Sequence, residues 1–234
     1  MCVLIVGVHC HEDAPLFLAA NRDEAYARRA TVPAPEELNG MRALLPRDEQ
    51  AGGTWIGINA AGLVAVLTNR RDGDFDRERR SRGLLCREIL SLPTVAASES
   101  FLAAAHERDH YNSFNLLVAD RDEVALLSWN GESRTTRLGP GMHVLSNEHI
   151  LGELEVPELD RSSGLHGAKL RELLVEVLGS HIRRDERGFR LCKHGDVYGT
   201  VSSSLLHRGR DGSLLFEHAP GPPCTTPFLA HRLD

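Results

Sequence analysis

The chain has 234 residues, of which 41% are hydrophobic, and a formal net charge of −6 at pH 7. This length suffices for the core of one domain, and the mixed charges include no basic stripe of the kind that binds nucleic acid. The first apolar run is too short for a signal peptide or a span of the bilayer. We therefore expect one cytoplasmic domain over residues 1–234, without stable membrane insertion, and a poorly ordered tail over about 219–234. The sequence leaves the oligomeric state open.

The chain opens with a predicted hairpin. Residues 2–9 and 16–20 are apolar runs joined by a turn-like segment that contains Pro15. The second strand is expected to end at the Asn-Arg-Asp-Glu tetrapeptide of residues 21–24. Residue 2 is thereby predicted to lie on a central strand.

A second hairpin follows a long connection. Residues 25–51 are polar and contain three prolines, and a connection of this length inside a compact domain is usually a functional or mobile loop. Residues 54–58 and 63–68 then read as strands around the turn 59–62, and they end on Asn69. Both hairpins therefore end in polar side chains.

Three helices are predicted from apolar periodicity and capping residues. They cover residues 82–91 after Ser81, residues 95–107 after Thr94, and residues 163–179 with Ser162 or Ser163 as the cap and Gly179 at the end.

Further strands are predicted at residues 114–119, 124–129, 143–146, 200–206 and 214–218. Many of these runs are too apolar to face water on one side, so both faces of each sheet need cover. The pattern predicts an α+β fold, a four-layer α/β/β/α sandwich of two packed antiparallel sheets flanked by helices.

Cys2 is the most informative single residue. Removal of Met1 would leave a thiol and a free α-amine on one residue, and the unperturbed pKa of an α-amine, about 7.7 to 8.0, lets it accept the thiol proton near neutral pH. The alternative is a small, inert residue that begins a buried strand. The sequence therefore offers Cys2 as an N-terminal nucleophile.

Five sequence blocks after the Met-Cys start carry a resemblance. They are Asn-Arg-Asp-Glu at 21–24, Gly-Gly-Thr-Trp-Ile-Gly-Ile at 52–58, Tyr-Asn-Ser-Phe-Asn-Leu at 111–116, Leu-Ser-Asn-Glu at 145–148 and Tyr-Gly-Thr at 198–200. Together they closely resemble the NRDE family, also called the transport and Golgi organisation protein 2 family, over nearly the whole chain. The resemblance implies a branch of the N-terminal nucleophile (Ntn) hydrolases, near penicillin V acylase and the bile salt hydrolases, with the same α/β/β/α fold.

Catalytic roles follow from this resemblance. Arg22 is similar to the residue that favours the thiolate, and Asp23 to the residue that orients the α-ammonium group. Neighbouring strand residues point to opposite faces, so both cannot face Cys2 without a bulge or a strand end. Asn21 with Asp23 is the geometrically simpler pair, and structural ion pairs at a polar strand end are the alternative for the whole tetrapeptide.

Asn69 and Asn147 resemble the oxyanion-hole donors of the relatives, since a side-chain amide is a suitable donor. Either could instead satisfy local backbone groups at a strand end. Asn21, Glu24 and Trp55 complete the candidates as substrate-binding residues, although an aromatic residue in an apolar strand usually packs in the core.

One departure from the family pattern concerns Val201. The Tyr-Gly-Thr block is usually followed there by an arginine that resembles the last pocket arginine of the acylases, so a second cation is missing here. Two functions stay open. The first is hydrolysis of a non-peptide amide or related acyl bond of a small metabolite, and the second is non-catalytic carriage of haem or an acyl lipid in the same pocket.

No metal or required cofactor is predicted. The cysteines form an odd, scattered set without a C-x-x-C pair: Cys2, Cys10, Cys86, Cys192 and Cys224. Such a set argues against a disulfide framework and against a thiolate zinc site. The run at residues 9–11, His-Cys-His, lacks an evident fourth ligand.

Overall fold

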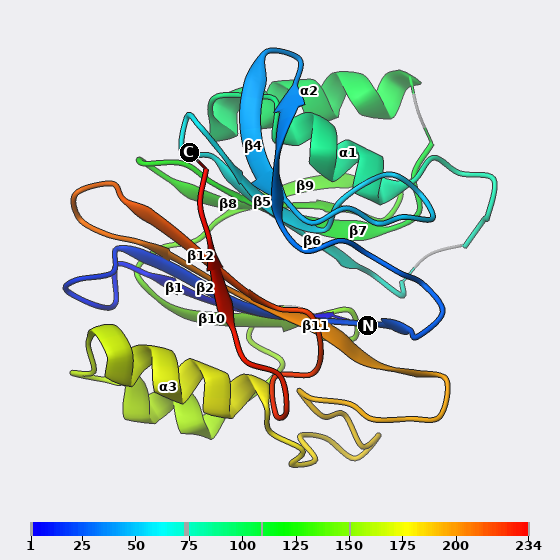
Figure 1. Ribbon diagram of the computed structural model, residues 1–234. Coiled ribbons are helices and arrows are strands. Elements are labelled where there is room, and N and C mark those ends of the chain that lie inside the picture. The colour runs from blue at the N-terminus through cyan, green and yellow to red at the C-terminus, as the bar shows by residue number, and fades with distance from the viewer. Residues whose placement is uncertain (1, 73–74, 109, 150, 234) are drawn as a thin grey trace. The chain divides into compact units, whose positions relative to one another are not determined.

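The computed structural model describes residues 2–72, 75–108, 110–149 and 151–233, except the side chains of Cys2 and of residues 106–108. The chain forms two compact units. Unit 1 comprises Met1–Ala27 and Gly139–His231, and unit 2 comprises Arg28–Leu138 and Arg232–Asp234. The positions of the two units relative to one another are not determined (Figure 1).

Unit 1 contains a six-stranded antiparallel sheet in the order β10-β1-β2-β11-β12-β13. Its strands are β1 (Cys2–Val8), β2 (Leu16–Ala25), β10 (Gly141–Ser146), β11 (Tyr198–Arg208), β12 (Leu214–Ala219) and β13 (Leu229–His231). Figure 1 shows helix α3 (Gly167–Leu178) lying along one face of this sheet. The buried stripe of α3 packs with strand residues such as Val3, Ile5, Phe17 and Ala19. These odd-numbered positions of β1 and β2 define the α3 face of the sheet.

Helix α3 begins later than the sequence predicts. Residues Pro157–Ser162 form a short 3-10 helix instead, because a proline starts that turn and Gly164, with φ of +74°, breaks the chain direction after it. Neither Ser162 nor Ser163 caps α3; His166 occupies the cap position. The predicted end at Gly179 is confirmed.

Unit 2 contains a seven-stranded antiparallel sheet in which the strands follow chain order. They are β3 (Ala34–Leu38), β4 (Met41–Leu45), β5 (Ile56–Asn59), β6 (Val64–Asn69), β7 (Phe114–Ala119), β8 (Val124–Trp129) and β9 (Ser133–Arg137). Helices α1 (Arg82–Ile89) and α2 (Val95–Arg108) share an apolar cluster with this sheet. The predicted cap of α2 is confirmed, because Ala97 N–H donates to Thr94 Oγ1 at 3.1 Å.

The expectation of a long loop over residues 25–51 is wrong in its centre. Strands β3 and β4 pair there as a hairpin, and its turn residues Asn39 and Gly40 have φ of +52° and +84°. An Asn-Gly pair favours this two-residue turn because both positions require positive φ. The Asn-Gly pair therefore indicates this hairpin in the sequence, although the prolines around it favour a loop.

The C-terminal segment also differs from the expectation of a poorly ordered tail. Strand β13 pairs with β12 through residues 229–231. Thr225 and Thr226 N–H groups both donate to Pro222 O, at 3.1 and 3.0 Å, which forms a tight turn before the strand. These backbone hydrogen bonds give the segment a defined path.

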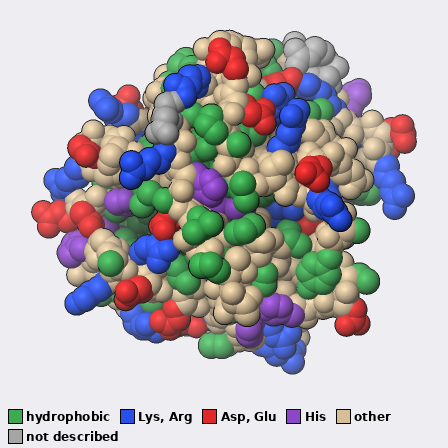
Figure 2. Space-filling model, in the orientation of Figure 1, with side chains coloured by type: hydrophobic (Ala, Val, Ile, Leu, Met, Phe, Trp, Pro, Cys, Tyr) green, Lys and Arg blue, Asp and Glu red, His purple; other side chains and the backbone are tan. Residues whose placement is uncertain are grey.

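Two further properties concern the helices and the surface charges. Within the described residues, every helix is too short or too polar to cross a bilayer. Acidic and basic side chains are interspersed on the face shown in Figure 2, in keeping with the mixed charges of the sequence.

Candidate functional site

The Asn-Arg-Asp-Glu tetrapeptide lies inside strand β2, which runs to Ala25 instead of ending before it. In the ladder, Arg22 pairs with Cys2 of β1 on one side and with Ser202 of β11 on the other. Strand β10 pairs Ser146 with Val3, so Asn147 is the first residue beyond that strand, at the level of residue 2. We call these four residues (Asn147, Cys2, Arg22 and Ser202) the polar row.

Asn21 lies on the α3 face and is fully engaged there. Its Nδ2 donates to Leu178 O at 2.9 Å and to Leu191 O at 2.8 Å. Its Oδ1 accepts a hydrogen bond from Ser203 Oγ at 2.6 Å. This side chain therefore joins the sheet to the end of α3 and to the connection after it.

Asp23 lies on the same face and is buried. Thr200 Oγ1 donates to its Oδ1 at 2.7 Å, and Lys193 Nζ lies 3.3 Å from its Oδ2. Burial raises the pKa of Asp23 above its usual value, and the charge of Lys193 lowers it in part. Asp23 is thus a buried carboxyl group with a specific cationic partner.

A β-bulge at Val201 separates the two faces. Thr200 pairs with Asp23 and Ser202 pairs with Arg22, so Val201 is the additional residue on β11. An additional residue lets Thr200 and Ser202, which a regular strand would place on one face, point to opposite faces. The position that departs from the family pattern is therefore the bulge itself.

The face opposite α3 carries unsatisfied polar atoms. Arg22 is buried there, at 6% exposure. Ser202 Oγ and Asn147 Oδ1 are also buried and have no hydrogen-bond partner among the described residues. Buried polar groups are nearly always satisfied, so such atoms often mark the place of a ligand or an ordered water.

The turn after β10 fixes Asn147. Ser146 Oγ accepts hydrogen bonds from the N–H groups of Glu148 and His149, both at 3.1 Å. Ser146 N–H donates to His149 O at 2.9 Å, and the His149 ring lies 3.2 Å from Asp185 Oδ2. Asn147 is therefore held at the apex of a hydrogen-bonded turn.

The other predicted residues lie as follows. Glu24 is half-buried and its Oε1 accepts a hydrogen bond from Ala25 N–H at 2.9 Å. The side chain of Cys2 lies outside the described residues. Asn69, at the end of β6, and Trp55, just before β5, are half-buried members of unit 2. The structure thus brings together Asn21 with Asp23 on one face, and Arg22 with the positions of Cys2 and Asn147 on the other.

Sequence reasoning missed Ser202, Thr200 and Lys193. Thr200 lies in the Tyr-Gly-Thr block, which marked the segment without marking the roles of its residues. Ser202 becomes visible only through the bulge, and Lys193 only through the approach of a distant connection to β2.

Two other features lie away from the polar row. Unit 2 carries an open pocket of about 550 Å³ lined by Tyr111, Trp129, His110, Arg79 and neighbouring residues, and none of the predicted site residues lines it. Unit 1 carries a group of four potential metal ligands (His181, Cys192, His194 and Cys224). Among the described residues, the His-Cys-His run at 9–11, for which the sequence predicts no metal, belongs to no such group.

Comparison with solved structures defines the fold. The structure resembles an N-acylethanolamine-hydrolyzing acid amidase ortholog from Caenorhabditis elegans, with a TM-score of 0.56 and 16% identity over 88% of this chain and 92% of the other. It also resembles a conjugated bile acid hydrolase from Clostridium perfringens in which alanine replaces the cysteine at position 2, with a TM-score of 0.52 and 10% identity over 100% and 97% of the chains. This likeness confirms the predicted α+β fold of the Ntn-hydrolase class.

Sequence comparison then defines the family. The family model for Transport and Golgi organisation 2 matches residues 1–162. The human Transport and Golgi organization protein 2 homolog is 36% identical over 86% of this chain and 84% of its own length. A Bos taurus homolog is 36% identical over 56% of this chain and 50% of its own length. The chain belongs to the Transport and Golgi organisation 2, or NRDE, family.

Proposed function

We propose that this protein is an Ntn-type cysteine hydrolase that cleaves a non-peptide amide or related acyl bond of a small metabolite. The observation that carries the proposal is the polar row, in which the backbone of residue 2 pairs with the buried Arg22. The row also includes two buried polar atoms without partners among the described residues, on Ser202 and Asn147. The similarity to two hydrolases with the same fold supports it.

The proposed reaction begins once Met1 has been removed. The α-amine of Cys2 takes the thiol proton, and the sulfur attacks the carbonyl carbon to form a tetrahedral oxyanion. The intermediate collapses as the C–N bond breaks, and the α-ammonium group returns the proton to the leaving amine. Water, deprotonated by the same amine, then hydrolyses the thioester and frees the acid.

Two further residues have proposed roles in this reaction. The guanidinium of Arg22 would stabilise the thiolate by its opposite charge. The amide N–H₂ of Asn147 would donate to the oxyanion. The fixed turn around Asn147 supports this role, because a donor that is already held in place needs no reorganisation during the reaction.

The α3 face supports a positioning role for Asp23. Its contacts with Thr200 and Lys193 hold it next to the paired backbone of Arg22 and residue 2. We propose that it orients the α-ammonium group through this strand end, and that Glu24 contributes to the substrate site. Asn21 would support the site indirectly, because it joins β2 to the end of α3. No bound cofactor is needed in this scheme.

The substrate class follows from the relatives and from Val201. One similar structure is described as an acid amidase that hydrolyses N-acylethanolamines, and another as a hydrolase of conjugated bile acids. Valine at the bulge supplies no charge for a strongly anionic group. We therefore propose an amide of an apolar acid with a neutral or weakly charged amine. A cytoplasmic location and reduced thiols are part of the proposal.

The test is turnover of a panel of N-acyl amides by the purified chain and by two variants. Cys2→Ala should abolish product formation, and Asn147→Ala should lower kcat about 10²-fold, the usual cost of losing one oxyanion donor. Product formation that persists in Cys2→Ala would contradict the proposed nucleophile. Tyr26→Phe serves as the matched control, because it is an exposed residue just beyond β2.

Carriage of an apolar ligand is the second candidate, favoured by Val201 at the bulge. Haem or an acyl lipid would then occupy the site without being cleaved. Haem titration followed by absorbance separates the two functions. Saturable binding that survives Cys2→Ala, with no turnover of any amide, would favour the carrier, whereas turnover that depends on Cys2 would favour the hydrolase.

A further inference from the structure

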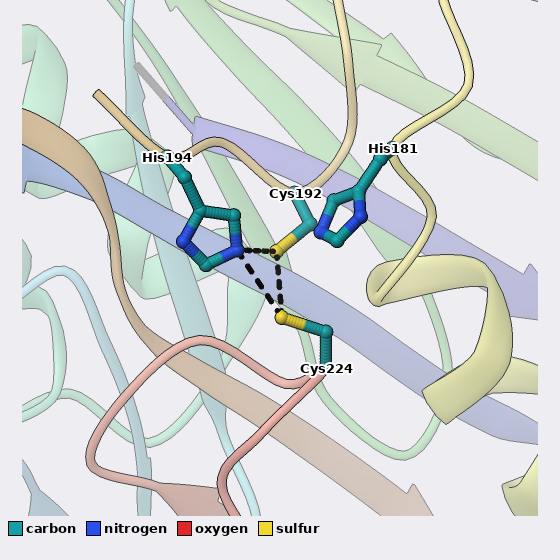
Figure 3. A group of neighbouring side chains, drawn as sticks. All are labelled: His181, Cys192, His194 and Cys224. Carbon is teal, nitrogen blue, oxygen red and sulfur yellow. Dashed lines mark hydrogen bonds between the residues drawn. The ribbon is translucent and has the colours of Figure 1, made fainter.

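Four potential metal ligands from separate segments of unit 1 meet beyond the C-terminal end of α3. His181 follows α3, while Cys192 and His194 lie in the connection to β11. Cys224 lies in the turn between β12 and β13. Figure 3 shows the Cys192 side chain between the two imidazole rings, with the Cys224 sulfur directed toward it. The ligand atoms of all four lie within 4.8 Å of one another.

The distances fit a tetrahedral ion. The two sulfur atoms lie 3.7 Å apart, and His194 Nε2 lies 3.6 Å from Cys192 Sγ and 3.2 Å from Cys224 Sγ. A tetrahedral zinc ion, with bonds of about 2.3 Å to sulfur and about 2.0 Å to nitrogen, separates two sulfurs by about 3.8 Å and a sulfur from a nitrogen by about 3.5 Å. Three of the four ligands therefore already occupy corners of such a tetrahedron.

His181, the fourth ligand, lies close to the remaining corner of the tetrahedron. The rings of His181 and His194 have centroids 5.1 Å apart and planes inclined at 76°. His181 is exposed, so its side chain can turn toward the sulfurs without disturbing packed neighbours. Two imidazoles and two thiolates then complete the set.

Backbone contacts hold the three segments that carry these ligands in place. Cys192 N–H donates to Ser180 O at 3.0 Å, which ties the segment of Cys192 to the residue before His181. His194 forms an isolated bridge with Gly199 at the start of β11. The tight turn at Pro222 fixes Cys224, and its backbone packs against Gly179, where an added Cβ would lie 3.5 Å from Cys224 Cα.

We propose that His181, Cys192, His194 and Cys224 bind one structural Zn²⁺ ion. A closed set of two sulfur and two nitrogen ligands is typical of structural zinc. Both thiols lose their protons on binding, so two thiolates balance the charge of the ion. This assignment replaces the sequence-based expectation of no metal, and it does not depend on the proposed hydrolase function.

A reactive dithiol is the competing interpretation. The 3.7 Å between the sulfurs is far longer than the covalent bond of about 2.05 Å. Two imidazoles beside the two thiols also complete a zinc ligand set, which a simple dithiol does not need.

Zinc at this place would join the connection between α3 and β11 to the C-terminal segment. Lys193, which lies between two of the ligands, contacts the carboxylate of Asp23. The ion would therefore also fix the path of the residue that pairs with Asp23.

The first experiment measures metal in the full chain purified without chelator. We expect close to one zinc per chain by mass spectrometry of the metals. After chelation, titration with Co²⁺ should give thiolate-to-cobalt charge-transfer bands and the intense visible bands of a tetrahedral site, and Zn²⁺ should displace them. Weak bands of octahedral cobalt without charge transfer would overturn the proposal.

Variants then assign the ligands. Cys224→Ala and His194→Ala should each weaken zinc binding more than about 100-fold, since loss of even an outer-shell partner costs 10- to 100-fold. Cys224 and His194 are exposed, so these variants should still fold. Cys10→Ser is the matched control, a half-buried thiol of the same unit outside the cluster, and it should bind zinc normally. Equal zinc content in Cys224→Ala, or a Cys192–Cys224 disulfide found by peptide mapping of the metal-free purified chain, would refute the assignment.

Discussion

The two faces of strand β2 differ in how their polar side chains are used. On the α3 face, Asn21 donates to two backbone carbonyls, Asn21 and Asp23 each accept a hydrogen bond from a hydroxyl group, and Asp23 pairs with Lys193. On the opposite face, Arg22 lies in a row with buried oxygen atoms of Ser202 and Asn147 that have no partner among the described residues.

In the proposed function, this difference separates residues that stabilise the fold from residues that take part in the reaction, within three consecutive positions of β2. The α3 face resembles an ordinary buried polar network, in which satisfied groups rigidify the fold. The opposite face buries polar atoms without hydrogen bonds, which costs free energy of folding and is typical of a site that binds a ligand. Substitutions on the α3 face should therefore act mainly on stability, with Asp23 also positioning the α-ammonium group in the proposed reaction. Substitutions in the polar row should act mainly on reactivity.

The largest expected effect is on stability. Asn21→Ala removes three hydrogen bonds and leaves two carbonyls and a hydroxyl buried without partners. Each unsatisfied group costs about 1–3 kcal/mol, so we expect a loss of about 3–5 kcal/mol in the free energy of unfolding. Urea denaturation measures it, and a loss below about 1 kcal/mol would show that the α3 face is not a structural network.

The next effect concerns the reactivity of residue 2. Arg22→Gln removes the positive charge paired with Cys2 in the ladder, so alkylation of Cys2 near neutral pH should slow about 10- to 100-fold, as expected for a thiol pKa that rises by one to two units. Arg22→Lys keeps the charge and serves as the control, with a smaller change. Equal rates in all three proteins would remove Arg22 from the proposed site.

A pair of adjacent serines gives a matched comparison of the two faces. Ser203 Oγ donates to Asn21 at 2.6 Å, whereas Ser202 Oγ has no partner among the described residues. Ser203→Ala should destabilise the fold by about 1–2 kcal/mol, and Ser202→Ala by less than about 0.5 kcal/mol. Thermal unfolding of both variants measures the difference, and a larger loss in Ser202→Ala would reverse the assignment of the faces.

The smallest effect is a pH dependence of the stability that comes from His218, on the same face of the sheet as Arg22. Burial lowers the pKa of His218 to about 4, with smaller contributions from the charges of His231 and Arg22. The unfolded state takes up this proton near pH 6.5, whereas the folded state takes it up only near pH 4. The contribution of neutral His218 to the free energy of unfolding is therefore fully present above pH 6.5. It decreases as the pH is lowered, by about 1 kcal/mol between pH 7 and 5.5.

Denaturant titrations at several pH values test this dependence. His218→Gln should remove this part of the slope, because the substituted side chain does not titrate in this range. A slope unchanged by the substitution would assign the pH dependence to other groups.

Much of the fold could be predicted, because the apolar periodicity of a helix or strand is visible within its own segment of the sequence. The stripe of α3 and the paired apolar runs of β1 and β2 are visible without any partner. The hairpin at residues 34–45 was missed despite its Asn-Gly turn, since the prolines on either side favoured a loop.

The candidate site could be predicted only in part. Cys2, Arg22 and Asn147 carry local signals, but which face each side chain shares depends on pairing between distant strands. The bulge at Val201 exists only because β11 pairs with β2 out of step. The four proposed zinc ligands could not be predicted from the sequence, because their spacing matches no short motif and three separate segments must meet to form the cluster.

The most direct test of the proposed function is intact mass measurement before and after a limiting thiol-directed electrophile, followed by peptide mapping. The account predicts a chain that lacks Met1 and is labelled selectively at Cys2 near neutral pH, ahead of Cys10, Cys86, Cys192 and Cys224. Retained Met1, or labelling spread over the exposed thiols, would contradict an N-terminal nucleophile.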